Sequence, residues 1–183
     1  LRARLYDPTR GRVLLDGRDI RTYTPEERTT RIGFILQESY LFTGTIRDNI
    51  LYGHSKYAGY SGEQLMQLLT EHNVAELVSR FADGLDTKVS SSGEAISLGQ
   101  KQLIAFMRAV LRDPEILILD EATANVDTVT EQLLEQILTK LPASTTKVII
   151  AHRLNTIADA DEIFFINAGT ITPAGSMEHA LEM

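Results

Sequence analysis

The feature that most constrains the fold of this chain is a short apolar segment that ends in two acids. Ile116–Leu119 contains β-branched residues and follows Asp113-Pro114, where a helix cannot continue. An apolar run bounded by a turn is typical of a strand that is covered on both faces. Asp120 and Glu121 come directly after it, at the end where open parallel sheets place their ligands. The carboxyl end of this strand is therefore a candidate functional site.

A helix-forming segment precedes this strand. Ser97 can cap a helix, because its hydroxyl can accept a hydrogen bond from a free N–H of the first turn. Apolar residues then recur at helical spacing and predict a buried face, at Leu103, Phe106, Met107 and Val110. A helix N-terminus is partly positive, and Gly99 lets the backbone approach a ligand closely. The first turn is therefore a candidate phosphate site.

Composition limits the classes to which the chain can belong. The 183 residues are 43% hydrophobic, which is enough for a core and too much for disorder. No apolar run approaches the roughly 20 residues that span a bilayer, and no signal-peptide pattern is present. The absence of cysteine excludes disulfides and fits a reducing compartment. The net charge of −7 argues against nucleic acid as a partner.

Other segments carry weaker signals for strands and helices. Strands are predicted at residues 13–15, 32–36 and 147–151, the last one buried, and hairpin turns at 16–17 and 168–169. Helices are predicted to begin at Thr24, Glu63, Asn73 (with Glu76 completing a capping box), after Asp127, and at Ser176. The helix after Asp127 has an apolar stripe that includes Val129, Leu134, Ile137 and Leu138.

Five segments in a fixed order resemble the ATP-binding-cassette (ABC) ATPases. Ile96–Gln102 is similar to the signature motif, Ile116–Glu121 to the Walker B strand and Asn125–Asp127 to the D-loop. The chain from Tyr6 to Ile50 resembles the segment that contains the Q-loop. Within it, the sequence of residues 41–50 resembles the exporter branch of the family. The segment from Lys147 to Ile171 is similar to the H-loop region, so the resemblance covers nearly the whole chain.

The resemblance implies a fold class and a domain division. The fold is expected to be α/β, a P-loop NTPase-like ABC ATPase core with a mostly parallel sheet and an inserted helical subdomain. Residues 1–183 would form a partial nucleotide-binding domain, with 1–37 and 114–183 in the ATPase core and 38–113 in the helical subdomain.

The resemblance also implies the residues of a catalytic site for ATP and Mg²⁺. Gln37 would contact Mg²⁺ and the attacking water and would couple to a transmembrane partner. Asp120 would hold the Mg²⁺ shell, and Glu121 would orient or deprotonate the water. His152 would contact the γ-phosphate and the water.

A second set of residues is implied to act across a dimer of two nucleotide-binding domains. Ser97, Gly99 and Gln100 would contact the γ-phosphate of ATP that is held by the opposing subunit. Asp127 would link the two sites. The sequence does not distinguish a homodimer from a heterodimer.

Each signal has a simpler explanation when it is taken alone. Two acids after a strand can simply mark its emergence into solvent, and Gln37 alone is usually a surface amide. His152 alone is more often a structural histidine. Three histidines have no motif around them and are expected to be solvated: His54, His72 and His179. The functional assignment therefore depends on the combination of motifs.

One departure from the family pattern is large. No G-x-x-x-x-G-K-[S/T] loop occurs in this sequence, and that loop supplies the phosphate cradle and its lysine. Residues 1–183 alone are therefore expected to bind ATP very weakly, and the chain is expected to begin partway through a larger protein. The missing segment is expected to include a strand next to Ile116–Leu119, so the isolated chain is expected to be unstable, to oligomerise or to swap elements.

Smaller departures affect the dimer contacts. Leu98 stands where the signature usually has Gly, and Ile96 stands where Leu is usual. This divergence favours the hypothesis that the chain belongs to one half of an asymmetric exporter. Three serines, Ser90–Ser92, replace an acidic loop that often meets the membrane domain.

The leading hypothesis is an ATPase module at the cytoplasmic face of the membrane, which powers export through a transmembrane domain. Two alternatives stay open, a non-catalytic assembly module and a non-transport ABC ATPase.

Overall fold

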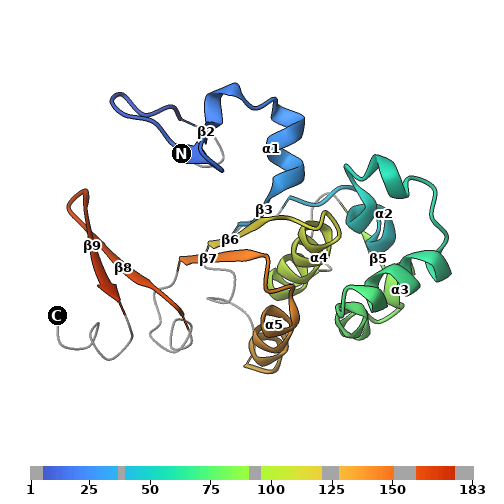
Figure 1. Cartoon of the computed structure of the whole chain (residues 1–183). Coiled ribbons are helices and arrows are strands. Elements are labelled where there is room, and N and C mark those ends of the chain that lie inside the picture. The colour runs from blue at the N-terminus through green and yellow to red at the C-terminus, as the bar shows by residue number, and fades with distance from the viewer. Residues whose placement is uncertain (1–5, 37–39, 91–95, 121–127, 151–159, 176–183) are drawn as a thin grey trace. The chain divides into compact units, whose positions relative to one another are not determined.

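The computed structural model describes residues 6–36, 40–90, 96–120, 128–150 and 160–175 (Figure 1). Contacts divide the chain into two compact units, Leu1–Val148 and Ile149–Met183. None of the helices described is long and apolar enough to cross a membrane.

A three-stranded sheet lies at the centre of the first unit. Its strands are β3 (Ile32–Ile35), β6 (Ile116–Asp120) and β7 (Thr146–Ile150), in the order β3-β6-β7. β3 and β6 are parallel, and Ile35 lies opposite Leu119. Both predicted strands are therefore present, and their carboxyl ends lie side by side at one edge of the sheet.

The position of β6 corrects one expectation from the sequence. β6 has β3 on one side and β7 on the other, so no further strand can pair with it. An additional strand can join only at the outer edge of β3 or β7, and the prediction of a missing strand beside β6 is wrong. The prediction that β7 is buried is also wrong, because the side chain of Ile150 is 46% exposed.

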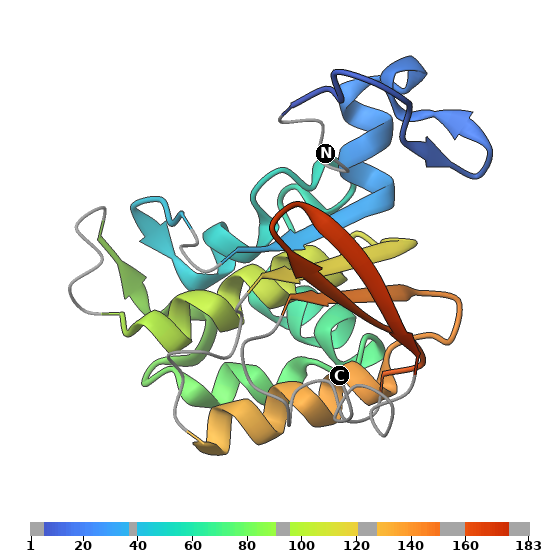
Figure 2. The same cartoon turned by 90° about the vertical axis from the view of Figure 1, so that its left-hand side faces the viewer.

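Helix α4 (Leu98–Val110) packs against β3 (Figure 2). Ser97 is its N-cap, and Ser97 and Gln100 form a reciprocal capping box. The predicted apolar face is buried, since Leu103, Phe106, Met107 and Val110 are all at most 3% exposed. The sequence therefore predicted both the start and the buried face of this helix correctly.

The first residues described form a hairpin and a short helix. β1 (Leu14–Leu15) and β2 (Arg18–Asp19) pair around Asp16-Gly17, whose φ angles of 49° and 74° fit the tight turn that the sequence predicts. The 3-10 helix η1 (Ile20–Thr22) follows, and then α1 (Pro25–Arg31). Thr24 caps α1 in a capping box with Glu27, as predicted.

Between β3 and α4 the chain is mostly helical. The elements are β4 (Gly44–Thr45), α2 (Ile46–Leu51), η2 (Ser55–Tyr57), α3 (Gly62–Glu71), η3 (Ala75–Arg80), η4 (Gly84–Asp86) and β5 (Lys88–Val89). β4 and β5 pair antiparallel. Helix α2 was not expected from the sequence, although Thr45 and Asp48 form a capping box at its start. The expected capping box of Asn73 and Glu76 is wrong, because Val74 is the N-cap of η3 and has no side-chain hydrogen bond.

The last elements described are one helix and one hairpin. α5 (Thr128–Lys140) buries Leu134, Ile137 and Leu138 as predicted, but Val129 is 60% exposed. In the second unit, β8 (Ile163–Asn167) and β9 (Thr170–Gly175) form the predicted hairpin. The helix predicted from Ser176 lies outside the described residues.

Candidate functional site

The amino end of α4 has the geometry of an anion site. The side chain of Ser97 is exposed, and its Oγ accepts a hydrogen bond from Gln100 N at 3.1 Å. Gln100 Oε1 accepts from Ser97 N at 3.0 Å, and Gln100 Nε2 donates to Arg80 O at 2.8 Å. The first helical N–H groups, those of Leu98 and Gly99, have no intrahelical acceptor.

Gln100 has a structural role that its motif did not reveal. Its amide closes the capping box and also fixes the carbonyl of Arg80 at the end of η3. In this conformation its side chain therefore holds the first turn of α4 in place. Gly99 is buried in the same turn.

Asp120 is the one predicted metal ligand that the structure describes. It is the last residue of β6 and is partly buried. Among the described residues, no group of three His, Asp or Glu side chains is close enough together to hold a metal ion by itself. Mg²⁺ is usually held by one or two carboxylates together with phosphate oxygens and water. One carboxylate at the end of the strand therefore fits an ion that is shared with a bound triphosphate.

The other predicted site residues lie outside the described part of the chain. They are Gln37, Glu121, Asp127 and His152. Ile35 lies opposite Leu119 in the parallel pair, so the described ends of β3 and β6 finish at the same edge. Those four assignments remain predictions.

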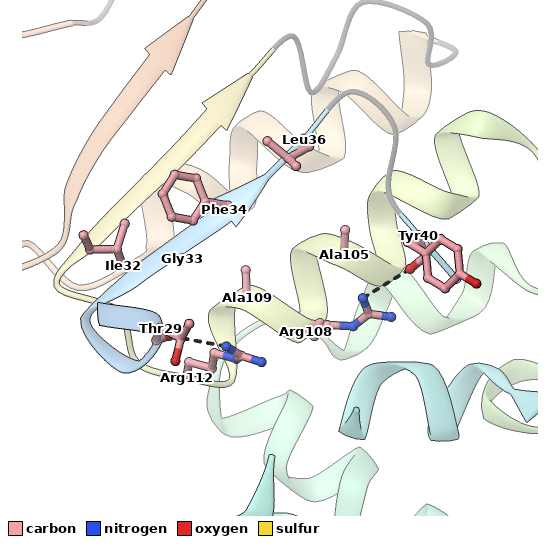
Figure 3. A pocket seen from close by; sticks show the side chains of 10 residues that line it. All are labelled: Thr29, Ile32, Gly33, Phe34, Leu36, Tyr40, Ala105, Arg108, Ala109 and Arg112. Carbon is pink, nitrogen blue, oxygen red and sulfur yellow. Dashed lines mark hydrogen bonds between the residues drawn. The ribbon is translucent and has the colours of Figure 1, made fainter. Parts of the chain in front are cut away.

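A pocket with a volume of about 280 Å³ lies between β3 and the carboxyl half of α4 (Figure 3). Its walls are mostly apolar, with Ile32, Phe34 and Leu36 from β3 and its extension, and Ala105 and Ala109 from α4. Thr29 and Tyr40 close the two ends, and Arg108 and Arg112 supply the charge.

The two arginines of this pocket hydrogen-bond only to backbone carbonyls among the described residues. Arg108 donates from Nε to Asn49 O at 2.8 Å and from Nη1 to Tyr40 O at 3.3 Å. Arg112 donates from Nη1 to Thr29 O at 3.3 Å. Burial lowers the pKa of both guanidinium groups below the ordinary value, and the neighbouring charge of Arg112 lowers that of Arg108 further. Sequence reasoning missed this pair, although two arginines four residues apart, in the last turn of α4 and just after it, were a visible signal.

An aromatic cluster borders the pocket on the side of Arg108. The rings of Tyr40 and Phe42 are 5.0 Å apart in an edge-on arrangement, and those of Phe42 and Tyr52 are 3.9 Å apart. The guanidinium carbon of Arg108 lies 5.8 Å from the ring centroid of Tyr52. Tyr40 is 72% exposed and Tyr52 is 53% exposed, so the cluster presents apolar surface to solvent.

Two histidines that were expected to be solvated have partners instead. His54 is only 8% exposed, and its Nε2 lies 2.9 Å from Arg108 O. Burial lowers the pKa of His54 below its ordinary value. His72 contacts Leu68 O through Nδ1 at 2.9 Å and Asp113 Oδ1 through Nε2 at 3.0 Å. The expectation was therefore wrong for both, and both histidines contact α4 or the turn that follows it.

The parallel sheet and the helices beside it define an α/β protein, and comparison with known proteins gives its family. The sequence model of the ABC transporter family matches residues 1–124. The chain belongs to the ABC transporter family.

The relatives of this chain are much longer than the chain. It is 45% identical to the ABC transporter ATP-binding protein YfiC of Bacillus subtilis, over 99% of this chain and 30% of YfiC. It is 42% identical to a multidrug resistance ABC transporter ATP-binding and permease protein of Lactococcus lactis, over 94% of this chain and 29% of that protein. A bacterial Atm1-family ABC exporter with ATP bound has a similar structure, with a TM-score of 0.82 and 36% identity over 98% of this chain and 31% of the exporter chain. The chain therefore spans about 30% of the length of these relatives, and the fold class predicted from the sequence is confirmed.

Proposed function

We propose that this chain is part of the ATP-hydrolysing module of an exporter at the cytoplasmic face of a membrane. In the whole protein, ATP binding and hydrolysis would power export through a transmembrane domain. The observation that carries the proposal is the position of Asp120 at the carboxyl end of β6, beside the end of the parallel strand β3. The similarity to an exporter with ATP bound supports it.

The proposed reaction is transfer of the γ-phosphoryl group of ATP to water. This reaction needs an oriented water and compensation of charge more than covalent chemistry. Asp120 would hold the Mg²⁺ shell, and Glu121 would accept a proton from the water or orient it. His152 would donate a hydrogen bond to the phosphate, and Gln37 would contact both the ion and the water. Mg²⁺ supplies charge neutralisation at the phosphates when it is bound.

The amino end of α4 is proposed to serve a second nucleotide-binding domain. Ser97 is exposed at this helix end, and the N–H groups of Leu98 and Gly99 have no acceptor within the helix. These groups, with Gln100, would bind the γ-phosphate of ATP that the other domain holds, and Asp127 would join the two sites. Two domains would thus enclose two ATP molecules between them.

Residues 1–183 are expected to be insufficient for tight ATP binding. The sequence has no phosphate loop of the G-x-x-x-x-G-K-[S/T] type, which provides most of the N–H donors for the phosphates. We therefore expect this part of the protein to be inactive by itself. A longer chain that includes such a loop is expected to hydrolyse ATP.

The test is the rate of ATP hydrolysis by the complete protein in lipid vesicles, for wild type and for Glu121→Gln. Glutamine keeps the size of the side chain and removes the proton acceptor, so we expect the rate to fall at least a hundredfold while ATP binding persists. Glu135→Gln, on the exposed face of α5, is the control and should leave the rate unchanged. If Glu121→Gln retains most of the activity, Glu121 is not the catalytic base. A wild-type protein that binds ATP without hydrolysing it would favour the non-catalytic alternative.

A further inference from the structure

Arg80 connects the amino ends of two helices. Its backbone carbonyl, at the end of η3, accepts a hydrogen bond at 2.8 Å from Gln100 Nε2, in the first turn of α4. Its guanidinium donates from Nη2 to the hydroxyl oxygen of Thr130, in the first turn of α5, at 3.0 Å. These contacts join residues that are 20 and 50 positions apart in the sequence. One residue therefore holds the start of α4 and the start of α5 together.

Both contacts belong to the interior more than to the surface. Thr130 is 3% exposed, and Arg80 and Gln100 are partly buried. The amide of Gln100 is fixed in orientation, because its Oε1 accepts from Ser97 N at 3.0 Å and its Nε2 is left to donate to Arg80. Buried hydrogen bonds are costly to leave unmade, so the two contacts favour a single arrangement of the two helix starts.

Both helix starts are next to residues that are proposed to act across the dimer of nucleotide-binding domains. Ser97, Gly99 and Gln100 form the amino end of α4. Asp127 directly precedes α5 in the sequence. Phosphoryl transfer depends on the placement of the reacting groups, and a displacement of about 1 Å far from the chemistry can cost a hundredfold in rate. A residue that sets the arrangement of the two helix starts can therefore influence the rate without touching ATP.

We propose that Arg80 is a positioning residue for ATP hydrolysis, which sets the amino end of α5 relative to the amino end of α4. The inference rests on the proposed function and adds a residue that lies in none of the motifs of the sequence. Arg80 acts through Gln100 and Thr130 and does not itself bind the nucleotide.

The first experiment measures kcat and KM for ATP with the complete protein in lipid vesicles. The variants are Arg80→Met, which keeps a long side chain without donors, and Thr130→Val, which keeps the shape of threonine without its hydroxyl. We express kcat per molecule that binds ATP at saturation, so that unfolded protein does not contribute. Each change should lower kcat about fivefold or more and leave KM within about twofold, because the groups that bind ATP remain.

The double variant tests whether the two side chains act through one hydrogen bond. Arg80→Met and Thr130→Val break the same contact, so the double variant should be no slower than the slower single variant. Losses that multiply in the double variant overturn the shared contact. A loss in Arg80→Met together with a normal kcat in Thr130→Val would show that the charge of Arg80 acts by itself, and it would overturn the positioning role.

Two further variants serve as controls. Thr130→Ser keeps the hydroxyl and should retain kcat within about twofold of wild type. Arg18→Met is the matched control for Arg80→Met, because Arg18 also donates to a threonine hydroxyl, that of Thr22 at 2.9 Å, but within one short segment. It should leave kcat within about twofold of wild type. A loss in Arg18→Met as large as that in Arg80→Met overturns the proposal.

The second experiment tests the connection without ATP hydrolysis. Amide hydrogen exchange of the complete protein is compared between wild type and Thr130→Val. We expect faster exchange in the first turn of α5 and also at Gln100 N, because Arg80 is no longer held and the capping box at α4 loses a fixed neighbour. The first turn of α3, where Ser61 and Gln64 form the same capping box, should exchange as in wild type. Faster exchange at α5 alone overturns the proposal.

The two experiments also separate this inference from the proposed function. A wild-type protein that hydrolyses no ATP overturns the proposed function, and the exchange result still decides whether Arg80 couples the two helix starts. An active wild type with an unchanged kcat in both Arg80→Met and Thr130→Val overturns the positioning role alone.

Discussion

The two ends of α4 differ in how they satisfy their polar groups. At the amino end, Ser97 and Gln100 bond to each other's backbone N–H, and the result is an exposed and neutral cap. At the carboxyl end, Arg108 in the last turn and Arg112 just after the helix are partly buried and, among the described residues, donate only to backbone carbonyls of other segments. The capping hydrogen bonds at the first end join residues of one turn, whereas those at the second end join distant segments. One helix thus has a neutral capping box at one end and two arginines at the other.

The helix dipole favours this division. The amino end of a helix is partly positive and attracts phosphate, whereas the carboxyl end is partly negative and stabilises cations such as Arg108 in the last turn. Thirteen residues give a helix about 20 Å long. A rigid element of this length joins the proposed nucleotide contact to the pocket that contains Arg108 and Arg112. Changes that break the helix should therefore affect both ends, and changes at one end should leave the other intact.

The largest expected effect comes from the buried middle of α4. Phe106 is 1% exposed, and Phe106→Ala would leave a cavity that the packed surroundings cannot fill. We expect the free energy of unfolding to fall by about 3–5 kcal/mol. Chemical denaturation followed by circular dichroism measures it. Phe164→Ala, at a side chain that is 54% exposed on β8, is the control and should change the value by less than about 0.5 kcal/mol. Equal losses in both variants would contradict the burial of α4.

A smaller loss of stability is expected where Phe42 of the aromatic cluster is hydrogen-bonded to α2. Asn49 is 1% exposed and accepts from Phe42 N at 2.8 Å, and its Nδ2 donates to Phe42 O and Thr45 O. Asn49→Ala leaves the N–H and carbonyl of Phe42 without these partners and should lower the free energy of unfolding by about 1–3 kcal/mol. Amide hydrogen exchange at Phe42 should become faster, while exchange in the first turn of α4 should not change. Faster exchange at both places would contradict the independence of the two ends.

The next effect depends on pH and involves His54. Burial holds the folded-state pKa of His54 below its unfolded value near 6.5, so the unfolded chain binds more protons in the window below pH 6.5. Stability should therefore fall as the pH is lowered through that window, with a slope of at most about 1.4 kcal/mol per pH unit from this residue. His54→Gln keeps a donor for Arg108 O and cannot be protonated, so the difference between its profile and that of wild type isolates the effect. If stability has the same dependence on pH in His54→Gln and in wild type, the lowered pKa of His54 is contradicted.

Local sequence signals predicted the caps but failed where one residue can serve two elements. Thr24 and Ser97 are N-caps, as their sequences indicate. Asn73 has the same pattern with Glu76, yet it adopts a φ of 58° and ends α3. Its N–H donates to Thr70 O and the N–H of Val74 to Leu69 O, which is a Schellman motif. Asparagine tolerates the left-handed conformation, so the end of α3 determined its role instead of the start of η3.

Burial was harder to predict than secondary structure. Periodicity identified β7 as a strand, but it cannot tell whether another layer covers that strand, and Ile150 is exposed. His54 was expected to be solvated because no motif surrounds it, whereas a contact with Arg108, 54 residues away, buries it. The same limit applies to Arg112, whose pocket is made by segments distant in the sequence. The amino end of the site could be predicted because its geometry is local, and the carboxyl end could not.

The most direct test of the account compares two serines that cap helices in the same way. Ser61 and Gln64 form the same capping box at α3 as Ser97 and Gln100 form at α4. Ser61→Ala and Ser97→Ala should each cost about 1 kcal/mol of stability, because each removes one cap. In the complete protein in vesicles, we predict that Ser97→Ala lowers ATP hydrolysis at least tenfold and that Ser61→Ala leaves it within twofold of wild type. Equal rates in the two variants would contradict a role of the amino end of α4 in nucleotide binding.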